Sequence, residues 1–418
     1  MSRFLLVSLN IDAILQETTI RGRRQKLSAI TDGLGLESAY GETLGRIKKQ
    51  GGARRARLGM TSLMWISHSE RPLKAVELCH ALAVEIGSQN VNSDDVPSIG
   101  TVLACCQGLV TVDKEGFTIR LIHYTLQEYL RIHPELFGTV HSTMAETCLS
   151  YLNSRQVRTL STSPSPDLQG TPFLEYSSQY WGMHARQDLS DCAKLLALKL
   201  FDNYHDHIST KILLEAQEGY SYTVDLHKPH PFSGSHCASL FGVIEIVNCL
   251  IEADCCDINQ RDCVGNTPLV WAARNGHELV VESLLKGSNI GPDKPGVDGQ
   301  TPLWNAACNG YEGVVKMLLE REEVNPEKQD NNGRTPLYAA AWNGNTGVVK
   351  ILLERDEVNP GNPDNDGRTP LDASALNGHA GVVKILLERD EVDADCPRDD
   401  GRTPLCAAAQ AFQWVDPG

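Results

Sequence analysis

The chain has 418 residues, of which 41% are hydrophobic and 22% are charged, and this ordinary globular composition excludes a collagen-like or wholly disordered protein. Its length exceeds that of a single domain of about 100 to 200 residues. The formal net charge of −15 is uneven, because residues 231–418 hold 15 Lys and Arg against 29 Asp and Glu. That acidic half would repel phosphate backbones, so we expect no nucleic-acid partner for it.

No segment of the sequence predicts insertion into a membrane or export. The longest apolar run, Thr101 to Val112, is far shorter than the roughly 20 residues that span a bilayer, and Phe4 to Leu9 is too short for a signal peptide. The 13 cysteines are an odd number without framework spacing, which is typical of a reducing compartment. We therefore expect a cytoplasmic location, with the nucleus as the alternative, and no membrane partner.

The pattern of residues 54–160 predicts a winged-helix domain. Helices are expected over 54–68, 72–86 and 97–108, the second with Ser69 as cap and Pro72 in its first turn. Two strands, 109–112 and 117–122, are then expected around a turn at 113–116. Further helices are expected over 124–131 and 134–152. Three helices followed by a β-hairpin is the order of elements in a winged helix.

Residues 161–230 are predicted to connect this domain to the rest of the chain. Ser161 to Pro172 is rich in Ser, Thr and Pro, which is typical of a linker. Helices are expected near 173–186, 188–201 and 208–218.

The C-terminal half contains an internal repeat. The tripeptide Thr-Pro-Leu recurs every 34 residues, beginning at Thr267, Thr301, Thr335, Thr369 and Thr403. Glycines, paired valines and paired leucines recur in the same register. Asp-x-x-Gly suits a tight turn, Thr-Pro suits the start of a first helix, and Val-Val-x-x-Leu-Leu places apolar groups on one face of a second helix. One such unit cannot bury its apolar face alone, so the repeats must stack as an α-solenoid.

The stretch Gly265 to His277, with the sequence GNTPLVWAARNGH, resembles the ankyrin repeat. The register places a degenerate first repeat near Pro231, with Gly242 ending its first helix. The last unit begins at Thr403, and the tail with Phe412 and Trp414 is expected to fold over its open end unless the sequence is truncated. We thus predict an all-α dominated protein with about five ankyrin repeats plus a truncated unit over 231–418.

A second resemblance concerns the N-terminal half. RLIHYTLQEYL, from Arg120 to Leu130, resembles the end of the winged helix in fungal NACHT-type (STAND, NLR-like) signalling ATPases, and residues 1–53 resemble the helical end of their nucleotide-binding domain. Members of that family bind nucleotide through an upstream P-loop, but this sequence has no Gly-Lys pair. We therefore expect no enzyme activity and no cofactor. The alternatives are an ATPase switch whose P-loop domain is missing from the sequence, and a plain scaffold.

Three possible sites were weighed against structural explanations. The resemblance gives His123 a contact with the phosphate of ADP, which would require an ATPase domain, so a histidine that ends a wing strand and is satisfied by nearby backbone is favoured. Residues 97–108 contain no Lys or Arg, which disfavours DNA binding by the third helix. The cluster of His236, Cys237, Cys249, Cys255, Cys256 and Cys263 lacks Cys-x-x-Cys spacing, so no metal site is expected.

The ankyrin resemblance implies a protein or peptide partner on a concave surface of hairpin tips and first-helix ends, and no small-molecule substrate. Trp342 is the expected anchor because an aromatic side chain there is expected to be exposed, whereas Trp304 is expected to be packed between repeats. The register assigns five residues to this surface in each of three repeats. They are Val297, Asp298, Gln300, Cys308 and Asn309; Asn331, Asn332, Arg334, Trp342 and Asn343; and Asn365, Asp366, Arg368, Leu376 and Asn377.

Overall fold

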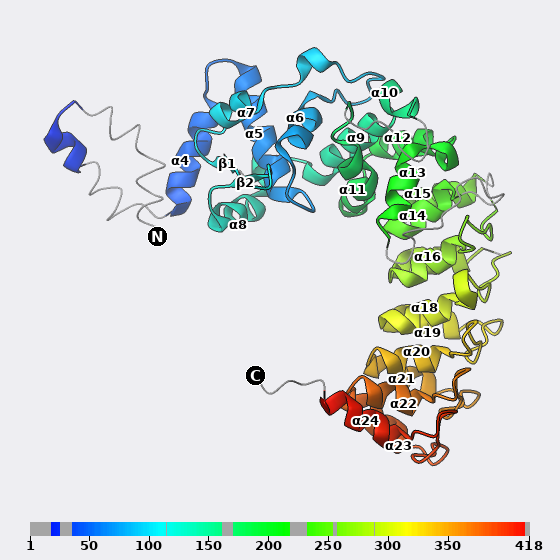
Figure 1. Ribbon diagram of the computed structural model, residues 1–418. Helices are drawn as coiled ribbons and strands as arrows, with labels where there is room; N and C mark the ends of the chain where they lie inside the picture. Colours follow the sequence, from blue (N-terminus) through cyan, green and yellow to red (C-terminus); the bar gives the residue numbers. More distant parts are fainter. Residues whose placement is uncertain are drawn as a thin grey trace. The chain divides into compact units, whose positions relative to one another are not determined.

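The computed structural model describes residues 18–25, 36–113, 115–160, 170–217, 232–253, 257–287 and 289–413. The chain divides into two compact units. The first comprises residues up to 200 together with 207–216, and the second comprises 201–206 and the chain from 217 onward. Both are mainly helical, and the described residues contain one small sheet, in the first unit (Figure 1).

The first unit is built from helices and one hairpin. Its elements are α4 (Leu36–Lys48), α5 (Ala53–His68), α6 (Ala75–Ala83), η1 (Ser93–Asp95), α7 (Ile99–Cys105), β1 (Val110–Val112), β2 (Ile119–Leu121), α8 (Tyr124–Ile132), η2 (Pro134–Leu136), α9 (Val140–Leu152), α10 (Arg155–Arg158), α11 (Leu174–Gln187), α12 (Asp191–Phe201) and α13 (Ile208–Glu215).

The predicted winged helix is present. Helix α5 supplies the buried side chains of Leu63 and Trp65, and α7 begins where the Ser98 hydroxyl accepts a hydrogen bond from the Thr101 amide at 3.2 Å. Strands β1 and β2 pair antiparallel, with Val110 opposite Leu121, and form the wing. Both strands fall within the ranges expected from the sequence and are shorter than predicted.

The second helix of this domain does not begin as predicted. It starts at Ala75 rather than Pro72, and Ser69 does not cap it. The reason is that the preceding residues pair with the wing: the Ile119 amide donates to the Leu73 carbonyl at 2.8 Å, and Lys74 bridges Thr118. Glu77 caps the helix instead, because its carboxylate accepts from the Lys74 amide at 2.7 Å.

The helices predicted over 134–152 are present as η2 and α9, and Gly138 at φ 73° separates them. Helix α11 packs against α9 through an aromatic cluster. The ring of Phe173 lies 5.5 Å from Trp65, 5.3 Å from Tyr151 and 5.6 Å from Tyr176. This cluster joins α11 to the winged helix in one compact unit, whereas the sequence assigned 161–230 to a separate connector. Most of the proposed linker, residues 161–169, lies outside the described residues.

The second unit is a stack of helix pairs joined by hairpin loops. Its elements are η3 (Tyr204–Asp206), α14 (Gly234–Phe241), α15 (Ile244–Glu252), α16 (Pro268–Arg274), α17 (Glu278–Leu285), η4 (Val297–Gly299), α18 (Pro302–Asn309), α19 (Glu312–Leu319), α20 (Pro336–Trp342), α21 (Thr346–Leu353), α22 (Pro370–Leu376), α23 (Ala380–Leu387) and α24 (Pro404–Gln413).

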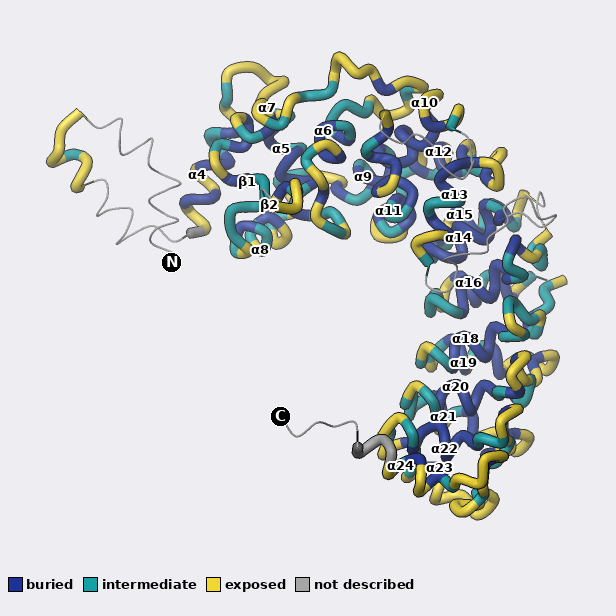
Figure 2. Tube along the Cα trace, in the orientation of Figure 1, coloured by how far each residue is buried: buried dark blue, intermediate teal, exposed yellow. Residues whose placement is uncertain are grey.

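Each repeat uses its sequence motif as predicted. Thr335 illustrates the start of a first helix, because its hydroxyl accepts from the Tyr338 amide at 3.1 Å while Pro336 fills the first turn. Gly344 ends that helix at φ 73°, and a Cβ there would lie 2.6 Å from the ring of His379 in the next repeat. First helices α16, α18, α20 and α22 form a continuous buried layer (Figure 2). Trp304 is buried in it, as expected.

The two ends of the stack differ from its middle. The degenerate first repeat exists as α14 and α15, with Gly242 at φ 76° between them and with Ile246 and Val247 buried. In the last complete repeat, Leu386 is fully buried but Leu387 is 51% exposed, whereas its counterpart Leu353 is 7% exposed. The tail that was expected to cover this end lies outside the described residues, apart from the backbone of α24.

Candidate partner-binding face

Neighbouring hairpin tips are joined by their backbones. The Asn331 amide donates to the Asp298 carbonyl at 2.7 Å, and the Asn365 amide donates to the Asn332 carbonyl at 2.9 Å. The side-chain amide of Asn365 also donates to the Asn331 carbonyl at 3.1 Å. The tips therefore form one continuous row.

An aspartate fixes the shape of two of these hairpins. One Asp330 oxygen accepts from the amides of Asn332 and Arg334, both at 2.9 Å, and Asp364 does the same one repeat later. Gly296 stands at this position in the preceding repeat, and its tip adopts a 3-10 turn with Asp298 at φ 55°. The tip row is thus held rigidly in register before any partner binds.

Asparagines end the first helices beside the row. The side-chain amide of Asn343 donates to the Ala339 carbonyl at 3.1 Å and to the Cys308 sulfur at 3.3 Å. Asn309 and Asn377 cap their helices in the same way, at 3.0 Å each. The bond from Asn343 to Cys308 links the helix end of one repeat to that of the repeat before it, whereas the other bonds lie within one helix.

Arg334, Tyr338 and Trp342 form a stack along α20. The Arg334 guanidinium lies 5.8 Å from the centre of the Tyr338 ring, and the Tyr338 and Trp342 rings are 6.3 Å apart with 16° between their planes. Burial raises the pKa of Tyr338, and the neighbouring charge of Asp364 raises it further. Because of this stacking, Trp342 is half-buried rather than exposed as predicted.

The fifteen residues assigned to the face differ in exposure. Eight are exposed: Asp298, Asn309, Asn331, Asn332, Asn343, Asn365, Asp366 and Asn377. Seven are partly buried: Val297, Gln300, Cys308, Arg334, Trp342, Arg368 and Leu376. The sequence analysis missed Tyr338, which supports both Arg334 and Trp342. Its register with Trp304 could have indicated a buried aromatic residue.

Comparison with known families agrees with this architecture. Models of ankyrin repeats match residues 203–295, 280–362 and 356–413, which together cover half of the chain. The chain is an ankyrin-repeat protein. A model described as the winged helix domain of GPI inositol-deacylase matches residues 48–137. No curated protein matches the chain.

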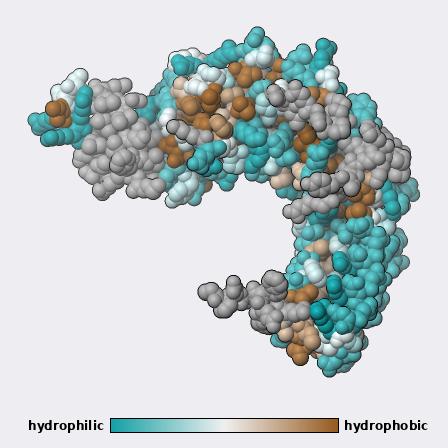
Figure 3. Space-filling model, viewed as in Figure 1, coloured by the Kyte–Doolittle hydropathy of each residue, from teal (hydrophilic) through white to brown (hydrophobic). Residues whose placement is uncertain are grey.

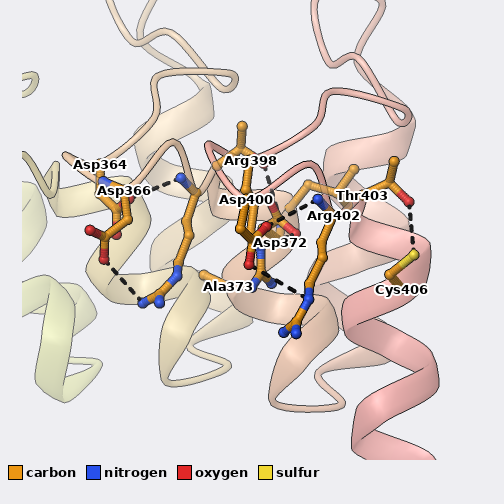
Figure 4. A network of polar contacts seen from close by, with 12 residues as sticks. Asp364, Asp366, Asp372, Ala373, Arg398, Asp400, Arg402, Thr403 and Cys406 are labelled. Carbon is orange, nitrogen blue, oxygen red and sulfur yellow. Dashed lines mark hydrogen bonds and ion pairs between the residues drawn. The ribbon is translucent and has the colours of Figure 1, made fainter.

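The last hairpin of the ankyrin array contains a pair that the sequence analysis also missed. Arg398 occupies the position of Asp364, and its Nε donates to an oxygen of Asp372 at 3.0 Å (Figure 4). Asp372 is fully buried and the Arg398 side chain is 6% exposed. Burial raises the pKa of Asp372, while the Arg398 charge opposes that rise. The signal for this pair in the sequence was Arg398 itself, because the corresponding position of the preceding repeat holds Asp364.

Two other candidate residues of this ankyrin-repeat protein have structural roles. His123 caps α8, because its Nδ1 accepts from the Thr125 amide at 3.3 Å. His236 is buried, its Nε2 donates to the Gln260 carbonyl at 3.0 Å, and its Nδ1 accepts from the Ser233 amide at 3.1 Å.

The suggested cysteine cluster shows no arrangement of metal ligands. Cys237 and Cys263 are buried, and Cys255 and Cys256 lie outside the described residues. Within the described ranges, no three His, Cys, Asp or Glu side chains are grouped to hold a metal ion.

In the same described ranges, no helix has the length and apolar character needed to cross a bilayer.

Proposed function

We propose that this ankyrin-repeat protein is a non-catalytic interaction module that binds a protein or peptide on its row of hairpin tips and first-helix ends. The observation that carries the proposal is the Arg334–Tyr338–Trp342 stack beside a rigid tip row. Aromatic and arginine side chains are the residue types that dominate protein interfaces. Pre-ordered side chains also lose little conformational entropy on binding.

The chemistry of the face favours a polar polypeptide over an apolar small molecule. Eight of the assigned residues are exposed amides or acids, and Arg368 lies 3.6 Å from Asp366 at its edge. Hydrogen-bonding groups on an open row suit an extended polypeptide, whereas small-molecule sites are concave and mostly apolar. We infer that the partner presents backbone groups and charged side chains to the tips and one hydrophobic side chain to Trp342.

We further propose that the winged-helix unit belongs to a NACHT-type signalling regulator in the cytoplasm or nucleus, with the array as its sensing part. The match to a winged-helix model and the arrangement of residues 120–130 support this role. Residues Ile99–Cys105 form α7, the helix that would read DNA, and contain no Lys or Arg. A role in protein signalling therefore fits the winged helix better than sequence-specific DNA recognition.

The proposal is tested by identifying a partner with the full chain as bait and then measuring its affinity for three variants. Trp342→Ala and Arg368→Ala should each weaken binding by about tenfold or more, as expected for interface anchors. Lys350→Ala, an exposed change on α21, should bind as the wild type does. Equal affinities for all three variants, with unchanged thermal melts, would contradict the proposed face.

A further inference from the structure

The turn between α4 and α5 carries an unusual density of positive charge. Residues 46–57 contain six Lys and Arg and no Asp or Glu. Five of these six side chains are exposed: Lys48, Lys49, Arg54, Arg55 and Arg57. We call residues 46–57 the basic turn.

The structure of α5 does not require these arginines. Arg54, Arg55 and Arg57 lie at the start of a 16-residue helix, where the macrodipole disfavours cations, and the helix has no acidic residue in its first turn and no side-chain cap. Arg54 has one ion pair, with Asp95 at 3.6 Å, and both partners are largely exposed. A locally unfavourable choice of residues is typical of a functional surface.

The array offers a surface of matching charge. The loops after α19, α21 and α23 each hold three exposed carboxylates and one arginine. The carboxylates are Glu320, Glu322 and Glu323; Glu354, Asp356 and Glu357; and Glu388, Asp390 and Glu391. We call these nine residues the acidic ridge. Hydrophilic residues predominate on the face of the array drawn in Figure 3.

Successive loops of the acidic ridge are fastened to one another. The Arg355 guanidinium donates to the Leu319 carbonyl at 2.9 Å, and Arg389 donates to the Leu353 carbonyl at 2.7 Å. Each arginine thus joins its loop to the preceding repeat, and Arg355 also forms an ion pair with Glu357 at 3.3 Å. The remaining carboxylates form a fixed row that faces solvent.

Other anionic partners fit the basic turn less well. A nucleic acid would also meet α7, which has no Lys or Arg, and the wing, where Arg120 is already paired with Asp113 at 3.2 Å. The array itself carries a net negative charge. A polyanion is therefore attracted by one short segment and repelled by half of the chain.

We propose that the basic turn binds the acidic ridge of a second copy of this chain. The ridge begins in the third repeat, after α14–α17. It presents a group of three exposed carboxylates in each of three successive loops, and each group can bind the basic turn of another molecule. Because turn and ridge are different surfaces, the contact is heterologous and joins successive copies into rings or open chains. The proposal is independent of the partner-binding face, which shares no residue with either surface.

Sedimentation velocity of the full chain over a range of concentrations tests this contact. At about 50 mM salt the weight-average sedimentation coefficient should rise with concentration, and at about 500 mM it should not, because screening weakens exposed ion pairs. Arg54→Glu/Arg55→Glu/Arg57→Glu should weaken self-association by roughly tenfold or more, as should Glu322→Lys/Asp356→Lys/Asp390→Lys. The arginine reversal should not harm folding, since acidic residues suit the start of α5.

Mixing the two reversed variants provides the sharpest control. In the arginine variant both turn and ridge are acidic, and in the carboxylate variant the turn stays basic and the reversed ridge positions become basic, so neither variant should self-associate. In an equimolar mixture the acidic turn of the first variant can bind the basic ridge positions of the second, so association should return. A wild type that stays monomeric at 50 mM salt would overturn the proposal. So would a mixture that stays monomeric, or a monomeric chain whose basic turn binds a single-stranded oligonucleotide.

Discussion

The buried ion pair of Asp372 and Arg398 stands where the preceding repeat has Tyr338 and Asp364. Arg398→Asp sets a second carboxylate against Asp372 in a site without water access. We expect this change to lower the free energy of unfolding of the array by roughly 3 to 5 kcal/mol, since it leaves buried charge uncompensated. Chemical denaturation followed by tryptophan fluorescence measures the loss.

The double change Asp372→Tyr/Arg398→Asp is the matched control, because it copies the residues of the preceding repeat into this one. Most of the lost free energy should return. A double variant as unstable as Arg398→Asp alone would show that the two positions are not coupled.

His184 makes the first unit sensitive to acid. Its Nδ1 lies 3.1 Å from Nδ1 of His141, its Nε2 lies 2.9 Å from the Tyr176 hydroxyl, and Trp65 packs against its ring. Burial, together with the nearby His141 and His68, lowers the pKa of His184 to about 3. The folded state therefore stays neutral at this ring while the unfolded chain takes up a proton below its ordinary pKa of 6.5.

The sign of the effect follows from that difference. The contribution of His184 to stability is complete above about pH 6.5 and falls as the pH drops toward 3, by about 1.4 kcal/mol per pH unit once the unfolded chain is protonated. Denaturant unfolding of the first unit at several pH values measures this slope. His184→Gln should reduce it by about one proton. An unchanged slope would mean that His184 is not buried as a neutral ring.

At this scale the sequence predicts some roles and not others. The cap at His123 and the packing of Trp304 follow from local pattern, because neighbours along the chain determine them. The environment of His184 does not, since Trp65 lies 119 positions away in the sequence and no period relates the two. Tyr338 was missed as the support of Trp342, although its register with Trp304 could have indicated a buried aromatic residue.

The helices of the last complete repeat provide a matched pair of leucines. Leu386→Ala should cost roughly 2 to 5 kcal/mol of unfolding free energy, because Leu386 is fully buried. Leu387→Ala should cost less than about 1 kcal/mol, because that side chain is 51% exposed. Equilibrium unfolding of the two variants makes the comparison. Equal losses would contradict the burial described for α23.

Element boundaries were predictable where the sequence supplies both a start and a stop signal. From α16 onward, each first helix starts at a Pro that follows Thr and, in the complete repeats, is followed by Gly, and each begins where expected. Pro72 wrongly indicates the start of helix α6, because Pro72 and Leu73 belong to an extended segment beside the wing. Pairing between residues 44 and 46 positions apart decides that boundary, and helix signals alone do not contain it.

At the scale of the whole molecule, the order of a winged helix followed by ankyrin repeats was predictable, because the 34-residue period is local and repeated. The division into compact units was not. Helix α11 joins the winged helix through Phe173 and Trp65, which are distant in the sequence. Net charge likewise indicates how the chain attracts or repels charged molecules. The exposure of the side chains in the basic turn and the acidic ridge became known only from the structure.

The central claim is that the row of hairpin tips and first-helix ends binds a protein partner. Hydrogen exchange of the full chain, with and without its identified partner, tests this most directly. We predict slower exchange at 297–300, 331–334 and 365–368 and at the ends of α18, α20 and α22, with little change in α19, α21 and α23. Protection confined to those second helices, or to the winged helix, would contradict the claim.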